Sequence, residues 1–454
     1  MSNQKSEYQG KAENNTVSTE DLILDDDEHD YDSDTQGKGT VFSGFLNLSN
    51  TIIGSGILGL PSAFMGLGYV MGTVFVVLCG LMSAFTLHLL SKCSHKIGGR
   101  HHSYGSVAHA SVPWLSWFVD LVVIFNCFGA GVSYLIIFGD NMPDFMEYVA
   151  KINDPDSIWL NRHLWISVAF VVFGIPLTVA PRLDFLKYTS FLALVSVTYC
   201  MILVILFWAE PSAEWNPCAD YTDESSCRGP SEAFNSNFLD IFKALPVYVF
   251  AFCCHYNIFG IYNEMRVQTV RSMDFVVSCA LCFVGSMYIV FGLGGYLTYG
   301  TETKSNILLN FPLNTVSSIA RFAISFVVAV SYPLMTHPVR SAMLHLYDII
   351  ISRFGSEEKS EKAGKIAYWV CTVIVLAVTY VIAMLVTDLG FVFGVIGATA
   401  SSMIAFVLPG VFYVMQYKGE TKDSAWEKVL FYGAWFFIAF GIVFSVIATY
   451  VMFV

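Results

Sequence analysis

Charged residues are scarce in this sequence. Only 13% of its 454 residues are Asp, Glu, Lys or Arg, whereas 55% are hydrophobic and 15% are aromatic. Soluble domains carry about a quarter charged residues, so this composition excludes a soluble protein of this length and indicates a polytopic membrane protein. The apolar stretches also lack a spaced His/Asp/Glu set for a metal and lack a nucleophile–base pair, which argues against an enzyme.

The first 40 residues lack apolar periodicity and differ in composition from the rest. Residues 1–38 contain eleven acidic residues and three lysines, which gives a net charge of −8. Such a polar, acidic segment cannot bury enough apolar surface to fold, so residues 1–40 are predicted to form a disordered cytosolic tail. The tail has no basic n-region or cleavage site and is not expected to be a signal peptide. A regulatory or trafficking role is the alternative to a merely solvated tail.

The rest of the chain contains eleven apolar stretches that could cross a bilayer, which takes about 20 residues each. With the tail in the cytosol, 18 Lys and Arg residues lie in cytosolic segments and four in external ones, and Val454 lies outside. This bias agrees with the positive-inside rule. The predicted spans are 42–67, 69–91, 114–141, 163–181, 186–209, 238–262, 273–298, 314–347, 366–387, 389–416 and 429–453.

The longest external segment, residues 210–237, is polar and acidic and carries two cysteines. Nine of the eleven cysteines lie in or beside apolar spans, but Cys218 and Cys227 lie nine residues apart in this loop. An external loop faces an oxidising compartment, where such a pair forms a disulfide. The sequence therefore predicts a disulfide between Cys218 and Cys227.

The first span contains a weak point at Gly54, Ser55 and Gly56, about twelve residues from its start. At about 1.5 Å per residue, this point lies about 18 Å into the bilayer, near its middle. Glycine costs about 1 kcal/mol per site in a helix. A helix break at this depth is tolerated where its backbone faces a cavity or other protein. Close helix packing through small residues is the alternative reason for these glycines.

The sixth span is interrupted as well. Its sequence, "ALPVYVFAFCCHYNIFGIYNEM" at 244–265, contains Pro246, Gly260 and a polar cluster from Cys253 to Asn257. The two interrupted spans are five spans apart and divide ten spans into two halves of five. Because each half has an odd number of spans, the second half has the opposite orientation in the membrane. This pattern indicates an inverted-repeat transporter with repeats at 41–209 and 238–416, followed by an eleventh span within 417–454.

Helix dipoles predict what the breaks bind. Carbonyl groups at Asn50–Ile53 form a partial negative end that suits a cation, and the N–H groups of Ser55, Gly56 and Ile57 form a positive end that suits a carboxylate. A zwitterionic amino acid and a small cation fit both ends. Gly54 shapes the break, and span six is expected to supply the remaining wall through Phe252, Cys253, His255 and Tyr256.

Three other polar residues of the spans have simpler interpretations. His255 is either a packed, hydrogen-bonded histidine or a proton carrier. Asp120 and Arg321 lie in apolar stretches but near span ends, so both side chains are expected to reach the membrane surface by snorkelling.

Three motifs resemble those of the sodium-coupled neutral amino acid transporters, a family of the amino acid/auxin permease superfamily. They are "NLSNTIIGSGILGLP" in span one, "FAFCCHYNIFGIYNEM" in span six and "SYPLMTHPVRSAM" in span eight. The similarity covers about residues 40–450. It implies a LeuT-type fold of ten core helices plus an eleventh, and symport of a neutral amino acid with a cation.

The resemblance also implies a cation site between spans one and eight. By position, Asn50 occupies the asparagine of that site, and Ser331 occupies a position usually held by threonine, which keeps the hydroxyl group. We therefore expect a cation between Asn50, the carbonyl of Ile53 and Ser331. The alternatives are that Asn50 forms an interhelical hydrogen bond and that Ser331 bonds back to its own helix. Tyr256 and Asn257 replace a Pro-Glu pair that is common after the histidine, so the resemblance leaves the substrate preference open.

The sequence therefore predicts an all-α polytopic membrane protein that carries small neutral amino acids with Na⁺ or H⁺ by alternating access. No cofactor and no nucleic-acid partner are expected. The plasma membrane is the first expected location and the vacuole or lysosome the second. The rival functions are a proton-coupled vacuolar or lysosomal exporter and an amino acid sensor with little transport. Breaks at the midplane suit occlusion rather than open conduction, which argues against a channel.

Overall fold

The computed structural model describes residues 37, 39–100, 102–179, 186–209, 216–218, 226–354 and 361–454. The predicted tail up to residue 36 lies outside these residues, as do positions 210–215 and 219–225 of the predicted external loop. The secondary structure within them is helical, apart from one β-bridge between Gly39 and Met265.

Ten helical segments are long and apolar enough to cross a membrane, and α2 followed by Gly56–Leu67 forms one further span with a bend of 44°. Within the described residues this confirms the eleven predicted spans. The helices of the bundle are α2 Val41–Ile53, α3 Leu60–Leu67, α4 Tyr69–Ile97, α6 Ser116–Ala150, α7 Arg162–Val168, α8 Ile175–Val179, α9 Leu186–Ala209, α10 Phe238–Ala251, α11 Ile258–Glu264, α12 Val270–Tyr299, α13 Thr315–Phe354, α14 Glu361–Leu385, α15 Leu389–Ile396, α16 Leu408–Gln416 and α17 Ala425–Met452.

The first span breaks where the sequence places its glycines. Helix α2 ends at Ile53, and Gly54 adopts φ +29°, a conformation that side chains rarely allow. The chain resumes as a short 3-10 helix, Gly56–Gly59, before α3. The sixth span breaks between α10 and α11, where another 3-10 turn covers His255–Asn257.

Two further spans contain wider π-helical turns that the sequence does not reveal. One lies at Ala169–Gly174, between α7 and α8, and two lie at Gly397–Ser401 and Met403–Val407, between α15 and α16. Helices α6 and α13 are also longer than the predicted spans 114–141 and 314–347, since they extend to Ala150 and Phe354. The apolar pattern marks only the membrane-embedded part of such helices.

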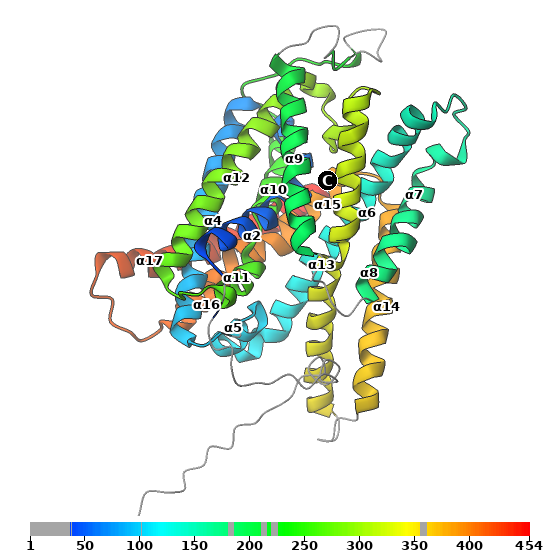
Figure 1. Ribbon diagram of the computed structural model, residues 1–454. Coiled ribbons are helices and arrows are strands. Elements are labelled where there is room, and N and C mark those ends of the chain that lie inside the picture. The colour runs from blue at the N-terminus through cyan, green and yellow to red at the C-terminus, as the bar shows by residue number, and fades with distance from the viewer. Residues whose placement is uncertain are drawn as a thin grey trace, which may run out of the picture.

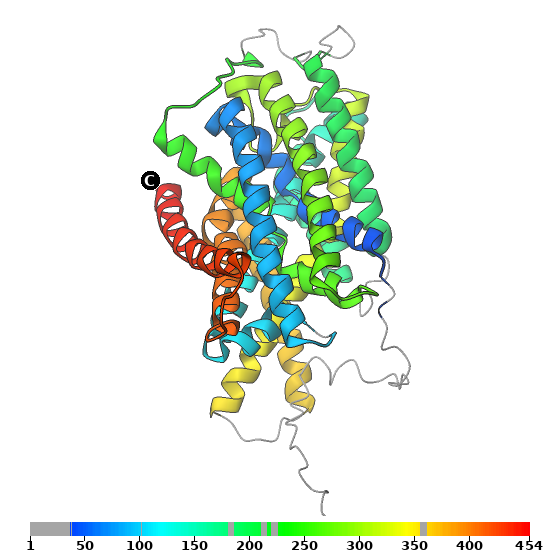
Figure 2. The same ribbon diagram turned by 90° about the vertical axis from the view of Figure 1, so that its left-hand side faces the viewer.

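Helices α6 and α13 pack extensively against each other, while α12 packs on α4 and α2 (Figure 1). Helix α10 packs on α3 and α15. Helix α17, at the red end of the colour scale, runs along the outside of the bundle and contacts α16 (Figure 2). The added eleventh span therefore covers the surface of the bundle.

Hydrogen bonds at the chain crossings define the two sides of the bundle. The N–H of Gly39 bonds to the carbonyl of Glu264 at 2.8 Å, which places the start of α2 beside the end of α11. The N–H of Tyr69 bonds to the carbonyl of Glu232 at 2.9 Å, at the far end of the first span. We call the side where α2 begins the N-terminal side and the other the opposite side.

Candidate functional site

A cavity of about 1130 Å³ lies between the two broken spans and the long helices α6 and α13. The short helix α5, Tyr104–Ser111, lines one end of it. Trp114 and Trp117 also line this end, and they are 69% and 48% exposed. Because α5 follows α4 on the N-terminal side, the cavity opens to that side.

The first break forms part of the cavity wall. Asn50, Ile53, Gly54, Ser55, Gly56 and Ile57 all line the cavity, and their binding roles stay predictions. The N–H of Gly54 bonds to the Asn50 carbonyl at 3.4 Å, and the N–H of Leu58 bonds to the Ser55 carbonyl, three residues before it, at 3.3 Å. The α-helical hydrogen-bond pattern is therefore interrupted at the cavity wall. Ser55 Oγ lies 3.0 Å from Ser133 Oγ of α6, which fixes the break to that helix.

Gly56 also has a packing role. A Cβ at this position would lie 2.9 Å from the Cα of Ala251 and 3.1 Å from its Cβ. The first break therefore touches the end of α10 directly. Gly56 therefore packs closely against another helix, as the alternative interpretation expects, and it also lines the cavity.

The second break contributes two of its four predicted residues to the cavity. Cys253 and Tyr256 line it. Among the described residues that line the cavity, Phe252 and His255 are absent. Phe252 packs edge-on against the ring of Tyr288, with 5.1 Å between the ring centroids. His255 is fully buried, and its Nε2 lies 2.9 Å from Thr86 Oγ1 of α4. This agrees with the packed-histidine alternative.

The predicted cation ligands share one cavity. Asn50 and Ile53 come from the end of α2, and Ser331 comes from α13, two residues before Pro333. Their side-chain and carbonyl oxygens are neutral. Within the described ranges, no group of three His, Cys, Asp or Glu residues could hold a metal ion. Neutral oxygens are ligands that suit alkali cations better than transition metals, and the cation site at these three residues stays a prediction.

Tyr288 of α12 joins the two breaks, a role that is not predicted from the sequence. Its hydroxyl lies 2.5 Å from the carbonyl of Ile52 and 2.9 Å from the carbonyl of Ala251, the last turns of α2 and α10. The side chain is fully buried. Beside it, Asn257 Nδ2 donates to Thr51 Oγ1 at 2.7 Å. A buried tyrosine hydroxyl usually has a hydrogen-bond partner, so a tyrosine in the middle of the seventh span is the sequence feature that could indicate this contact.

A second missed group lies where α6 meets the π-helical part of the tenth span. Asn126 lines the cavity and is 3% exposed. Its Oδ1 accepts a hydrogen bond from Ser401 Oγ at 2.7 Å, and Cys253 Sγ lies 3.9 Å from the same oxygen. The amide therefore holds three separate segments around the cavity.

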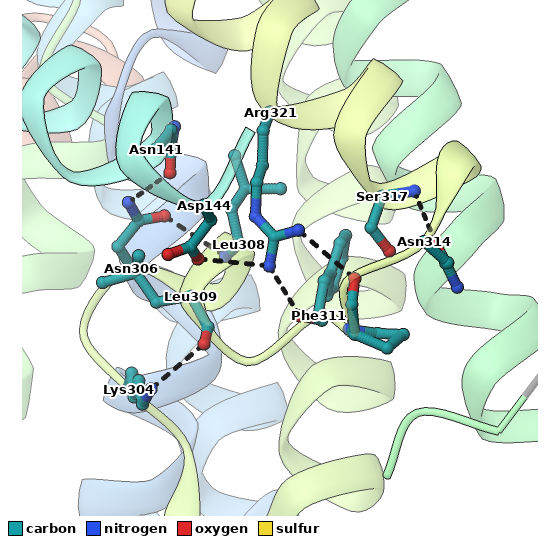
Figure 3. A network of polar contacts seen from close by, with 11 residues as sticks. Asn141, Asp144, Lys304, Asn306, Leu308, Leu309, Phe311, Asn314, Ser317 and Arg321 are labelled. Atoms are coloured by element: carbon teal, nitrogen blue, oxygen red, sulfur yellow. Dashed lines mark hydrogen bonds and ion pairs between the residues drawn. The ribbon is translucent and has the colours of Figure 1, made fainter. Parts of the chain in front are cut away.

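A polar network lies beyond the cavity on the opposite side (Figure 3). Arg321 is 1% exposed, contacts Asp144 of α6 at 3.3 Å and donates to the carbonyl of Phe311 at 2.6 Å. Asn306 Nδ2 donates to Asn141 Oδ1 at 3.0 Å. The cavity wall on α13 begins one turn later, at Ile324. This network therefore lies outside the cavity wall. The snorkelling interpretation of Arg321 is wrong because its charge is paired inside the bundle.

Asp120 is also buried rather than snorkelling. It is 5% exposed, lines the cavity, and its Oδ2 lies 2.6 Å from Nδ1 of His345 on α13. Nearby, Tyr104 of α5 donates from its hydroxyl to the Ile404 carbonyl at 2.8 Å. Burial raises the pKa of Tyr104 well above its usual value, so it stays a neutral donor.

Cys218 and Cys227 are joined by a disulfide, with 5.7 Å between their Cα atoms. This is the pair that the sequence predicts. Both half-cystines are buried, at 6% and 2% exposure. The bond lies away from the cavity wall and is part of the fold rather than of the site.

Comparison with known proteins gives a consistent family. The family model of transmembrane amino acid transporter proteins matches residues 37–454. Vacuolar amino acid transporter 6 of Saccharomyces cerevisiae is 30% identical over 411 residues, covering 82% of this chain and 89% of the relative. Vacuolar amino acid transporter 5 of Schizosaccharomyces pombe is 30% identical over 378 residues, covering 83% and 84%.

A solved structure has the same fold. It is a Na⁺-coupled sialic acid symporter in a substrate-bound, outward-open state, with a TM-score of 0.52 and 11% sequence identity over 91% of this chain and 89% of that one. The likeness confirms the LeuT-type fold, and at this identity it carries no information on substrate or ion.

Proposed function

Because the chain belongs to the transmembrane amino acid transporter family, we propose that it moves small neutral amino acids across a membrane together with a cation, Na⁺ or H⁺. It is an amino acid transporter rather than an enzyme. One observation carries the finer proposal: two broken helices meet at a single cavity, and the cavity opens to one side of the bundle. That geometry supports alternating access around a midplane site.

The wall between the breaks supports a small neutral substrate. The backbone at Ser55, Gly56 and Ile57 offers the positive end of a helical segment to a carboxylate. Within the described residues no Lys or Arg lines the cavity, and its acidic residues, Asp120 and Asp348, lie toward the N-terminal mouth. A charged side chain on the substrate would lack a counter-charge at the breaks and would pay its desolvation cost.

The driving ion and the membrane belong to the same proposal. Neutral oxygens at Asn50, Ile53 and Ser331 could hold an alkali cation at low affinity. The vacuolar names of the relatives support a second candidate, a proton-coupled exporter of the vacuole or lysosome with its N-terminal side in the cytosol. We therefore place an endomembrane location ahead of the plasma membrane.

Uptake of radiolabelled amino acids into proteoliposomes tests the proposal. Gradients of Na⁺ and of H⁺ are imposed separately, with protein-free vesicles as the control. Accumulation of small neutral amino acids under one gradient is expected, and lysine and glutamate should compete weakly. Absence of exchange for every neutral amino acid would reject the function. Binding of a decarboxylated amine as tightly as the amino acid would reject the carboxylate site at Gly54–Gly56.

A further inference from the structure

The cavity wall contains a carboxylate–imidazole pair near its N-terminal mouth, in which Asp120 is buried and the side chain of His345 is 42% exposed. Asp120 comes from α6 and His345 from α13, and both line the cavity. The two residues are 225 positions apart, and their Oδ2 and Nδ1 atoms lie 2.6 Å apart. An ionisable residue within a membrane span is unfavourable and commonly marks an ion or proton pathway.

The same two helices carry another pair at their other end. Asp144 of α6 contacts Arg321 of α13 at 3.3 Å on the opposite side, outside the cavity wall. Arginine keeps its proton at all physiological pH values, whereas histidine exchanges its proton near neutrality. The antiparallel helices are therefore joined by a permanently charged pair at one end and a titratable pair at the other, and the titratable pair is the one that faces the cavity.

Further ionisable groups lie near the pair within the part of the chain that the structure describes. His109 of α5 and Asp348 of α13 line the same mouth. Arg340 of α13 turns toward α14, where its guanidinium lies 4.3 Å from the ring centroid of Tyr368. Helix α2 contributes no charged side chain. The first turns of α14 carry Lys362 and Lys365.

We propose that Asp120 and His345 form a proton-binding site of the transport cycle, which exchanges its proton with the N-terminal side through the open cavity. The inference rests on the proposed function and names H⁺ as a coupling ion. With one proton bound, His345⁺ and Asp120⁻ cancel, and without it the pair carries a net charge of −1. Enclosing a net charge is unfavourable, so we expect closure of the cavity to favour the proton-loaded form. This holds whether or not an alkali cation binds at Asn50.

The test compares proton flux with amino acid flux in the same vesicles. Purified full-length protein is reconstituted with an internal pH-sensitive dye, and alanine is added at one side. Radiolabelled alanine counterflow is measured in parallel. In Asp120→Asn, the ratio of proton flux to alanine flux is expected to fall at least tenfold, while counterflow remains measurable. His345→Gln should lower the ratio in the same way, and Asp120→Glu, which keeps the carboxylate, should retain most of it.

Asp274→Asn is the matched control. Asp274 of α12 contacts His88 of α4 at 2.9 Å, and neither residue lines the cavity formed by the described residues. This variant removes a second carboxylate–imidazole pair of the same kind, so its flux ratio should equal that of the wild type.

The outcomes separate the inference from the function on which it rests. Alanine counterflow without any proton flux in the wild type overturns the inference and leaves the transport function standing. Absence of counterflow for all neutral amino acids overturns the function itself. A wild-type flux ratio in either Asp120→Asn or His345→Gln also overturns the inference, so one folded variant is sufficient for a decision.

Discussion

Replacing Tyr288 with phenylalanine should loosen both helix breaks at once. Its hydroxyl is shared between the carbonyls of Ile52 and Ala251, at 2.5 and 2.9 Å. The substitution removes one oxygen atom and leaves two buried carbonyls without this donor. A buried polar group that loses its partner costs about 1–3 kcal/mol. The ring and its contact with Phe252 are retained, so the effect is specific to the hydrogen bonds.

The loss should appear in substrate affinity as well as in stability, because the two carbonyls belong to the segments that form the site. A loss of about 1.4 kcal/mol in binding is a tenfold change. We therefore expect Tyr288→Phe to raise the half-saturation for substrate about fivefold or more, and to lower the thermal midpoint of the detergent-purified protein. Counterflow titrations and thermal unfolding measure the two quantities.

Tyr248→Phe is the matched control for this experiment. Tyr248 is also fully buried, and its hydroxyl has no hydrogen-bond partner among the described residues. Removing an unpartnered hydroxyl should be neutral or stabilising. If Tyr288→Phe behaves like Tyr248→Phe in both measurements, the hydroxyl does not hold the breaks. If stability falls while affinity is unchanged, Tyr288 supports the fold and does not position the site.

Three further substitutions and tests follow from the same geometry. Gly56→Ala should raise the half-saturation for substrate by about tenfold or more, since its Cβ would meet Ala251 Cα at 2.9 Å and overpacking costs about 1–3 kcal/mol. Gly80→Ala is the control, because the nearest neighbour of its Cβ would lie 3.8 Å away. Misfolding of Gly56→Ala with normal affinity in the surviving protein would indicate a packing role alone. Asn50→Ala should raise the half-saturation for the coupling cation more than that for the substrate, and unchanged dependence on both Na⁺ and H⁺ in uptake titrations would contradict the assignment. Cys218 and Cys227 should resist alkylation in protein unfolded without reductant, whereas the exposed Cys282 should react under the same conditions; modification of either loop cysteine before reduction would exclude the bond.

The sequence was sufficient for the number of spans and for the position of both breaks. Hydropathy defines a span by length, and Gly54, Gly56 and the polar run from Cys253 to Asn257 are visible without any knowledge of tertiary structure. Residues of the first break line the cavity. A backbone interruption can be located in the sequence without knowing which way a side chain points, but the binding roles of these residues stay a prediction. The repeat boundaries 41–209 and 238–416 stay a prediction.

The rotation of each helix about its axis was not predictable, and this accounts for the side chains that were misplaced. A span that is apolar on all faces gives no clue to which face meets the cavity. His255 therefore faces Thr86 rather than the cavity, and Asp120 meets His345 across 225 residues. The sequence shows how far Arg321 lies from the end of its span, which predicts a side chain at the membrane surface, but it does not show that Asp144 is its partner.

The pairing of Gly39 with Met265 has a mechanical consequence for the two broken spans. Gly39 exchanges backbone hydrogen bonds with Glu264 and Arg266, both at 2.8 Å, so α2 and α11 are tied together at the N-terminal side. About 15 Å from the start of α2, at about 1.5 Å per residue, Thr51 is bonded to Asn257. The two half-helices are thus hydrogen-bonded to each other at both ends, and neither can move relative to the other unless one of these contacts breaks. A displacement of the chain at Gly39 would therefore move both broken spans together.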